Sequence, residues 1–253
     1  MLALLAVAAL GKHHVTITPC TIEGPELVLA GELVDGLAVA PDGALIVIDG
    51  HADLHRYTII NKGADCTLKP DGVIETGLPT PFEIARVRVD PKSGAIYAHV
   101  GVIATSSNDV RIDGKKIEEA CAARDEKAPM CARDAWPVGD RRIVEGDPLM
   151  ELRDHDGKLV HPLFGARPAT ILARSWAACG AGICAAGEYA FYAWDARGTL
   201  VGSFSTDSLS YATGQWDPAG FVMIGKTGYL LGDEYTDGAP RKAAMIQRVD
   251  GLP

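Results

Sequence analysis

The sequence predicts an all-β protein built from antiparallel sheets, and three observations lead to this expectation. Its 253 residues include 28 glycines and 15 prolines, which indicates many tight turns. Most apolar runs are short, end at such turns, and in places alternate with polar residues as half-buried strands do. Amphipathic stretches of helical length are nearly absent, so an α/β arrangement with a parallel sheet is disfavoured.

A strand–turn–strand phrase recurs along the chain. Residues 37–48 read LAVAPDGALIVI, in which Pro41-Asp42-Gly43 separates two apolar runs. Residues 84–89 read IARVRV, with valines on one side and arginines on the other, and a turn at Gly94 follows. Further turns of this kind are predicted at Gly72, Gly157, Gly198 and Gly220.

The predicted turns fall into two groups, those at Gly43, Gly94 and Gly220 and those at Gly72, Gly157 and Gly198. A radial array of four-stranded antiparallel sheets contains two such kinds of hairpin in alternation. We therefore expect a small or irregular β-propeller, with a β-sandwich carrying long loops as the alternative. The expected domain spans residues 12–253 as one unit.

A polar stretch at about residues 106–150 interrupts the pattern. Residues 108–117 (NDVRIDGKKI) predict a hairpin with Asp113-Gly114 at its tip. Residues 117–127 (IEEACAARDEK) form the one convincing helical stretch, with acidic residues near its start and Lys127 near its end. We expect this stretch to be a disulfide-tied excursion on the surface.

The N-terminal residues favour export. Residues 2–10 read LALLAVAAL, which matches the apolar region of a secretory signal peptide, and Ala6-Val7-Ala8 offers a cleavage pattern. The alternative is a first core strand or helix. The apolar run is far shorter than the roughly 20 residues needed to span a bilayer. A secreted, periplasmic or cell-envelope location is therefore predicted.

Six cysteines support the same compartment, because an even number in an exported chain favours disulfides over free thiols. Their spacing suggests the pairs Cys121–Cys131 and Cys179–Cys184, which leaves Cys20 with Cys66. A zinc site is disfavoured, since no two of the cysteines have C-x-x-C spacing.

The charge of the chain bears on its partners. The formal net charge is -9, and an acidic chain repels phosphate. Nucleic acid and anionic membrane surfaces are therefore disfavoured as partners. What remains is a protein or small-molecule ligand of unknown identity.

Two nucleotide-binding patterns occur, and we reject both. Gly220–Thr227 (GFVMIGKT) has P-loop spacing, but its middle residues form a strand and no helix follows. Gly180–Ala185 (GAGICA) matches a dinucleotide-binding pattern, but it runs into the strand-like segment 188–194. We read the second as a tight loop that a disulfide could clip.

One family resemblance is visible in the strand phrases. Gly36–Tyr57 (GLAVAPDGALIVIDGHADLHRY) resembles a repeat of the NHL and gluconolactonase-type β-propellers. Ile84–Val100 is similar to a second repeat, and Trp216–Asp233 to a looser third. The resemblance implies a propeller of roughly four to six blades.

Candidate metal ligands come from two places. His51, Asp53 and His55 would share one face if the segment were extended, and imidazoles with a carboxylate suit Zn²⁺ or Fe²⁺. The gluconolactonase resemblance implies a metal-ligating glutamate in an E-G-P tripeptide, which Glu23 matches. The family's asparagine ligands have no counterpart in the Asn-Gly context that the resemblance implies.

The leading hypothesis is an exported, non-enzymatic protein that binds a ligand or partner through its loops, with no catalytic residue and no cofactor. The runner-up is a metal-dependent lactonase or related hydrolase, with Glu23 and Asp233 or Glu234 near a central divalent cation. A structural component of the cell envelope is the third alternative.

Overall fold

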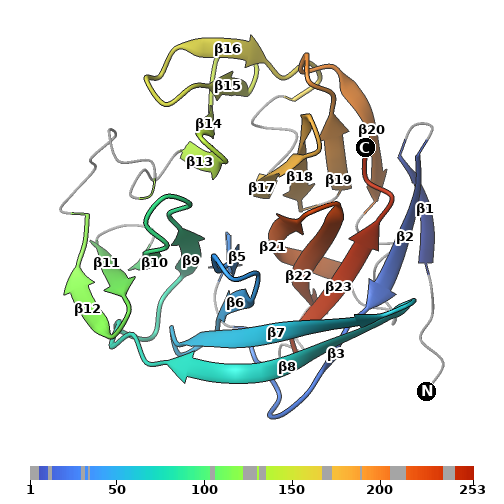
Figure 1. The fold of residues 1–253 in the computed structure, drawn as a ribbon. Helices are drawn as coiled ribbons and strands as arrows, with labels where there is room; N and C mark the ends of the chain where they lie inside the picture. Colours follow the sequence, from blue (N-terminus) through green and yellow to red (C-terminus); the bar gives the residue numbers. More distant parts are fainter. Residues whose placement is uncertain are drawn as a thin grey trace.

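The computed structural model describes residues 6–10, 13–29, 32–33, 35–102, 106–121, 130, 135–166, 173–188, 190–205, 215–235 and 243–253. All regular elements in these ranges are β-strands, and they form five sheets arranged as the blades of a propeller (Figure 1). The predicted all-β propeller is confirmed, and five blades fall within the expected number. In the same ranges there is no helix of a length and apolarity that would let it cross a membrane.

The first two blades follow the predicted repeats. Blade 1 contains β5 (Leu37–Val39), β6 (Leu45–Ile48), β7 (Leu54–Lys62) and β8 (Asp65–Ile74), with β3 (Thr21–Ile22) parallel to β8 at its outer edge. Blade 2 contains β9 (Ile84–Val89), β10 (Ile96–Val102), β11 (Ser106–Asp113) and β12 (Lys116–Glu119), with β4 (Glu32–Leu33) parallel to β9. All other pairings within these two sheets are antiparallel.

The next two blades are four-stranded and antiparallel. Blade 3 contains β13 (Ala135–Val138), β14 (Arg141–Val144), β15 (Glu151–Arg153) and β16 (Leu159–Pro162). Blade 4 contains β17 (Ala173–Cys179), β18 (Gly182–Gly187), β19 (Ala190–Trp194) and β20 (Leu200–Ser205).

Blade 5 joins the two ends of the chain and closes the ring. It contains β21 (Gln215–Ile224), β22 (Thr227–Tyr235) and β23 (Met245–Asp250), followed outward by β2 (His13–Pro19) and β1 (Ala6–Leu10). The N-terminal β2 pairs with the C-terminal β23, for example Ile17 with Val249. Residues 6–10, the last part of the apolar run predicted as a signal region, form β1, the extra strand at the edge of this blade.

Aspartate side chains organise several of the turns that the sequence predicts. The Oδ1 atom of Asp195 accepts hydrogen bonds from the amides of Arg197 and Thr199, and Asp154 does the same with the amides two and four residues on. The residue three positions on is Gly157 or Gly198, each with positive φ, which glycine adopts without strain. Turns also form at Gly43 and Gly94, as predicted.

Two predicted turns are wrong. Gly220 lies inside β21, where a Cβ atom would come within 2.7 Å of the Leu37 Cβ, so this glycine allows β21 and β5 to approach closely. Gly72 lies inside β8 opposite Arg56, at a bulge in the pairing of β7 with β8.

The polar stretch at about residues 106–150 differs from the surface excursion that we expected. Its first part supplies β11 and β12, which complete blade 2, and residues 135–144 supply β13 and β14. The predicted hairpin at Asp113-Gly114 is confirmed. The predicted helix over 117–127 is wrong in its first residues, because Lys116–Glu119 pairs with β11; residues 122–129 lie outside the described ranges.

Two of the predicted disulfides are present in the described residues. Cys20–Cys66 links the segment between β2 and β3 to β8, and so joins blade 5 to blade 1. Cys179–Cys184 spans the hairpin between β17 and β18. Cys121 is also disulfide-bonded, and its predicted partner Cys131 lies outside the described ranges.

The core is divided among the seams between blades. One cluster of buried apolar residues joins blades 1, 2 and 5, a second joins blades 4 and 5, and a third joins blades 3 and 4. Within the described residues none of these clusters bridges blades 2 and 3.

Candidate functional site

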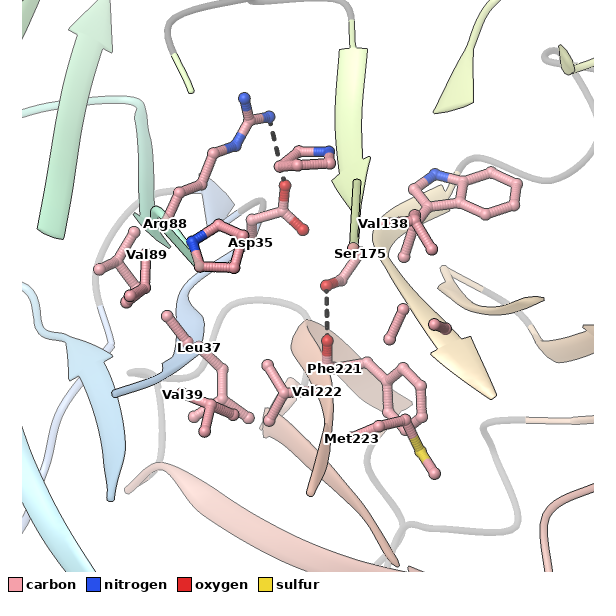
Figure 2. Close-up of a pocket in the computed structure, with 18 of the residues that line it drawn as sticks. Asp35, Leu37, Val39, Arg88, Val89, Val138, Ser175, Phe221, Val222 and Met223 are labelled. Atoms are coloured by element: carbon pink, nitrogen blue, oxygen red, sulfur yellow. Dashed lines mark hydrogen bonds and ion pairs between the residues drawn. The ribbon is translucent and has the colours of Figure 1, made fainter. Parts of the chain in front are cut away.

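A cavity of about 330 Å³ occupies the centre of the propeller. One strand from each of the five blades contributes to its wall: β5, β9, β13, β17 and β21. Most of the lining side chains are apolar, including Leu37, Val39, Val89, Val138, Val222 and Met223 (Figure 2). A volume and a wall of this kind are typical of a small-molecule site.

Two opposite charges interrupt the apolar wall. Arg88 extends from β9 and Asp35 precedes β5, and the Nη2 atom of Arg88 lies 3.5 Å from the Oδ2 atom of Asp35 (Figure 2). The side chains are 4% and 10% exposed. The same Nη2 atom donates a hydrogen bond of 2.9 Å to the backbone oxygen of Ala135 in β13.

Burial governs the electrostatics of this pair. The pKa of the Arg88 guanidinium is lowered to about 10, mainly because the group is buried and also because Arg86 is near, while the Asp35 carboxylate acts in the opposite direction. A buried ion pair adds little net stability by itself. Such a pair in the wall of a cavity is therefore a candidate for ligand recognition.

The backbone fixes the position of Asp35. Its φ is 58°, in the left-handed region that few residues other than glycine adopt. The backbone oxygen of Asp35 accepts from the Val87 amide at 2.8 Å, and the next residue, Gly36, donates its amide to Ala219 at 2.7 Å. Hydrogen bonds to residues of blades 2 and 5 thus fix the backbone on both sides of the Asp35 carbonyl.

Ser175 is the third polar residue of the wall. It lies on β17, is 2% exposed, and its hydroxyl donates to the backbone oxygen of Phe221 at 3.1 Å (Figure 2). This bond joins the inner strands of blades 4 and 5.

A row of polar residues crosses blade 2 beside the cavity. Arg86 pairs in register with His99 of β10, which pairs with Asp109 of β11. The His99 Nδ1 and Asp109 Oδ1 atoms are 2.7 Å apart. Arg86 and Arg88 share this face of β9, because alternate residues of a strand point the same way. The opposite face, with Ala85 and Val87, packs into the apolar cluster shared with blade 1.

His51, Asp53 and His55 do not converge. Residues 50–53 form a turn, so the extended arrangement that would align the three side chains is wrong. The turn is built around Asp49, whose Oδ1 accepts from the amides of His51 and Asp53 and whose Oδ2 lies 2.8 Å from the His55 Nε2. Burial opposes the ionisation of Asp49, but these bonds outweigh it and lower its pKa.

The residues named for the hydrolase alternative lie on two different blades, and none of them lines the cavity. Glu23 is exposed and follows β3 at the outer edge of blade 1. Asp233 is buried on β22, the second strand of blade 5, and Glu234 is the next residue of that strand. Within the described ranges no group of three or more His, Cys, Asp or Glu residues is placed to hold a metal ion.

Neither rejected nucleotide motif forms a phosphate loop. Gly220–Thr227 runs along β21 and through the Gly225-Lys226 turn into β22. Gly180-Ala181 is the turn of the disulfide-linked hairpin between β17 and β18.

The sequence analysis does not identify the Asp35–Arg88 pair. The alternation of residues 84–89 predicts a half-buried strand with its arginines on the polar side, but Arg86 and Arg88 are only 8% and 5% exposed. A signal was available, since arginine is seldom placed twice on an inner strand without a buried partner. The partner is 53 residues away in sequence, and only the fold brings it close.

No family model matches the sequence, and no curated protein is significantly similar to it. Among solved structures, the chain is similar to the glutaminyl cyclase of Myxococcus xanthus (14% identity, 93% of this chain and 99% of that chain, TM-score 0.49). It is also similar to a gluconolactonase of Xanthomonas campestris (11% identity, 98% and 95%, TM-score 0.42). A third is a putative TolB of Agrobacterium tumefaciens (12% identity, 96% and 88%, TM-score 0.39).

Proposed function

We propose that this protein is an exported, non-enzymatic binding protein that holds a small, mainly apolar molecule in its central cavity. The observation that carries the proposal is the cavity itself, which has about 330 Å³ of space and is walled by all five blades. Ligand sites in proteins are concave and mostly apolar, with a few placed polar groups that set the orientation of the ligand. Asp35, Arg88 and Ser175 are such groups.

The disulfides support the exported part of the proposal. The chain contains the disulfides Cys20–Cys66 and Cys179–Cys184. Disulfides persist in oxidising compartments and are rare in the cytosol. A cell-surface, periplasmic or secreted location would supply those conditions.

The test is a titration with N-phenyl-1-naphthylamine, a neutral apolar fluorophore whose emission rises in apolar surroundings. We expect saturable binding with one site per chain. Val222 lines the cavity (Figure 2), so Val222→Trp fills it and should weaken binding at least tenfold.

The matched control is Val73→Trp, which adds the same ring to an exposed position of β8, where the valine is 55% exposed. This variant should bind the fluorophore as the natural protein does. Equal loss in both variants, or no saturable binding to the natural protein, would overturn the proposal and favour the structural alternative. Stoichiometric Ca²⁺ or Zn²⁺ in purified protein would favour the hydrolase.

A further inference from the structure

The charged part of the cavity wall indicates which chemical class of molecule would bind. Arg88 on β9 and Asp35, which precedes β5, both line the cavity and present a positive and a negative pole to it (Figure 2). The Nη2 atom of Arg88 and the Oδ2 atom of Asp35 are 3.5 Å apart, which is longer than the usual hydrogen bond of about 2.7–3.2 Å. The two groups are therefore close enough to attract each other, and both face the space that a ligand would occupy.

The two poles discriminate among ligand charges. A ligand with one charge can pair with only one of the two poles, and it adds a net charge to a nearly buried site, which is unfavourable. A neutral apolar ligand would leave the pair as it is. A ligand that carries both charges can pair its carboxylate with Arg88 and its ammonium with Asp35, so that all four charges are balanced in a site of low dielectric.

The position of each pole is fixed by the fold. Asp35 is held by the backbone bond to Val87, and Arg88 is anchored by its hydrogen bond to Ala135. The remaining wall, with Leu37, Val222 and Met223, suits an aliphatic or aromatic body. Preorganised groups of this kind lose little entropy when a ligand binds.

We infer that the cavity binds a zwitterionic molecule with an apolar side chain, of the class of apolar α-amino acids and short apolar peptides. This inference rests on the proposed binding function and narrows its ligand class.

The test compares three six-carbon probes with unbranched apolar chains: norleucine, hexanoate and hexylamine. Each is titrated at pH 7 by calorimetry and by displacement of N-phenyl-1-naphthylamine. We expect norleucine to bind at least about tenfold more tightly than either singly charged probe, which corresponds to about 1.4 kcal/mol. Hexanoate or hexylamine binding as tightly as norleucine would overturn the inference.

Two variants test whether Asp35 and Arg88 cause the preference for norleucine over the singly charged probes. Asp35→Asn should weaken norleucine at least tenfold and leave hexanoate unchanged or tighter, and Arg88→Gln should weaken both norleucine and hexanoate. Should a variant fail to fold, the probe comparison on the natural protein still decides. Fluorophore binding that is lost in Val222→Trp, combined with no preference for norleucine, would refute the zwitterion and leave the binding function intact.

Discussion

The seam between blades 3 and 4 and the seam between blades 2 and 3 are built in opposite ways. At the first, Trp136, Trp176 and Trp194 form a series, with ring centroids 6.3 Å and 5.5 Å apart, and Trp194 is 1% exposed. At the second, blade 2 presents a face with Arg86, Arg88 and the His99–Asp109 pair, and Arg88 bonds directly to β13.

The difference shows where this fold is built for stability and where it carries polar chemistry. Aromatic side chains bury large apolar areas and gain further from their packing geometry. Buried charges contribute little net stability even when paired, so their presence needs another reason. The charged face adjoins the cavity, and one of its members, Arg88, lines it. The ligand recognition proposed above would supply that reason.

The largest effect is expected at the aromatic seam. Trp194→Ala should lower the free energy of unfolding by about 3–5 kcal/mol, because it removes a fully buried ring that stacks on Trp176. Urea denaturation measures the change. Phe164→Ala is the control at the same rim, since Phe164 is 52% exposed, and it should change stability by less than about 0.5 kcal/mol. A similar loss of unfolding free energy in the two variants would show that the aromatic packing between blades 3 and 4 is not a main source of stability.

Between blades 2 and 3, removing one charge of the Asp35–Arg88 pair should lower the stability more than removing both. Arg88→Met leaves the Asp35 carboxylate buried without its partner and should cost about 3 kcal/mol. Arg88→Met with Asp35→Asn removes both charges and should recover most of that loss. The measurement is again urea denaturation. A double variant no more stable than the single one would mean that the pair itself stabilises the ring.

The smallest effect on stability is expected at Asp49, a buried carboxylate with several hydrogen-bond partners. It is a useful contrast to Asp35, whose side chain is described with one partner, Arg88. The pKa of Asp49 is lowered in the folded protein, so its stabilisation is present above its ordinary value of 3.8 and is lost as pH falls through the folded value. Asp49→Asn should cost about 1–2 kcal/mol at pH 7. Melting curves at pH 7 and pH 3 check this, and a difference between the two proteins that grows in acid would contradict it.

Local rules made the turns and the fold class predictable. Asp–Gly turns such as those at Gly157 and Gly198 follow from side-chain bonds within five residues, and the sequence contains all of that information. Gly72 and Gly220 were misassigned because a bulge and a close approach between strands also favour glycine. The predicted helix was wrong at its start because pairing with β11 outweighs helix propensity there.

The site was less predictable than the fold. Tripeptide and spacing patterns pointed to Glu23 and to His51, Asp53 and His55, but these positions lie outside the cavity wall. The Asp35–Arg88 pair depends on how blades 1 and 2 meet, and no local pattern encodes that meeting. Long-range contacts of this kind are set by tertiary packing, which a single sequence does not display.

The most direct test of the account is a crystal structure of the protein soaked with norleucine. The account predicts electron density for the ligand in the central cavity, with its carboxylate beside Arg88 and its ammonium beside Asp35. An empty cavity in a crystal that binds norleucine elsewhere would contradict it.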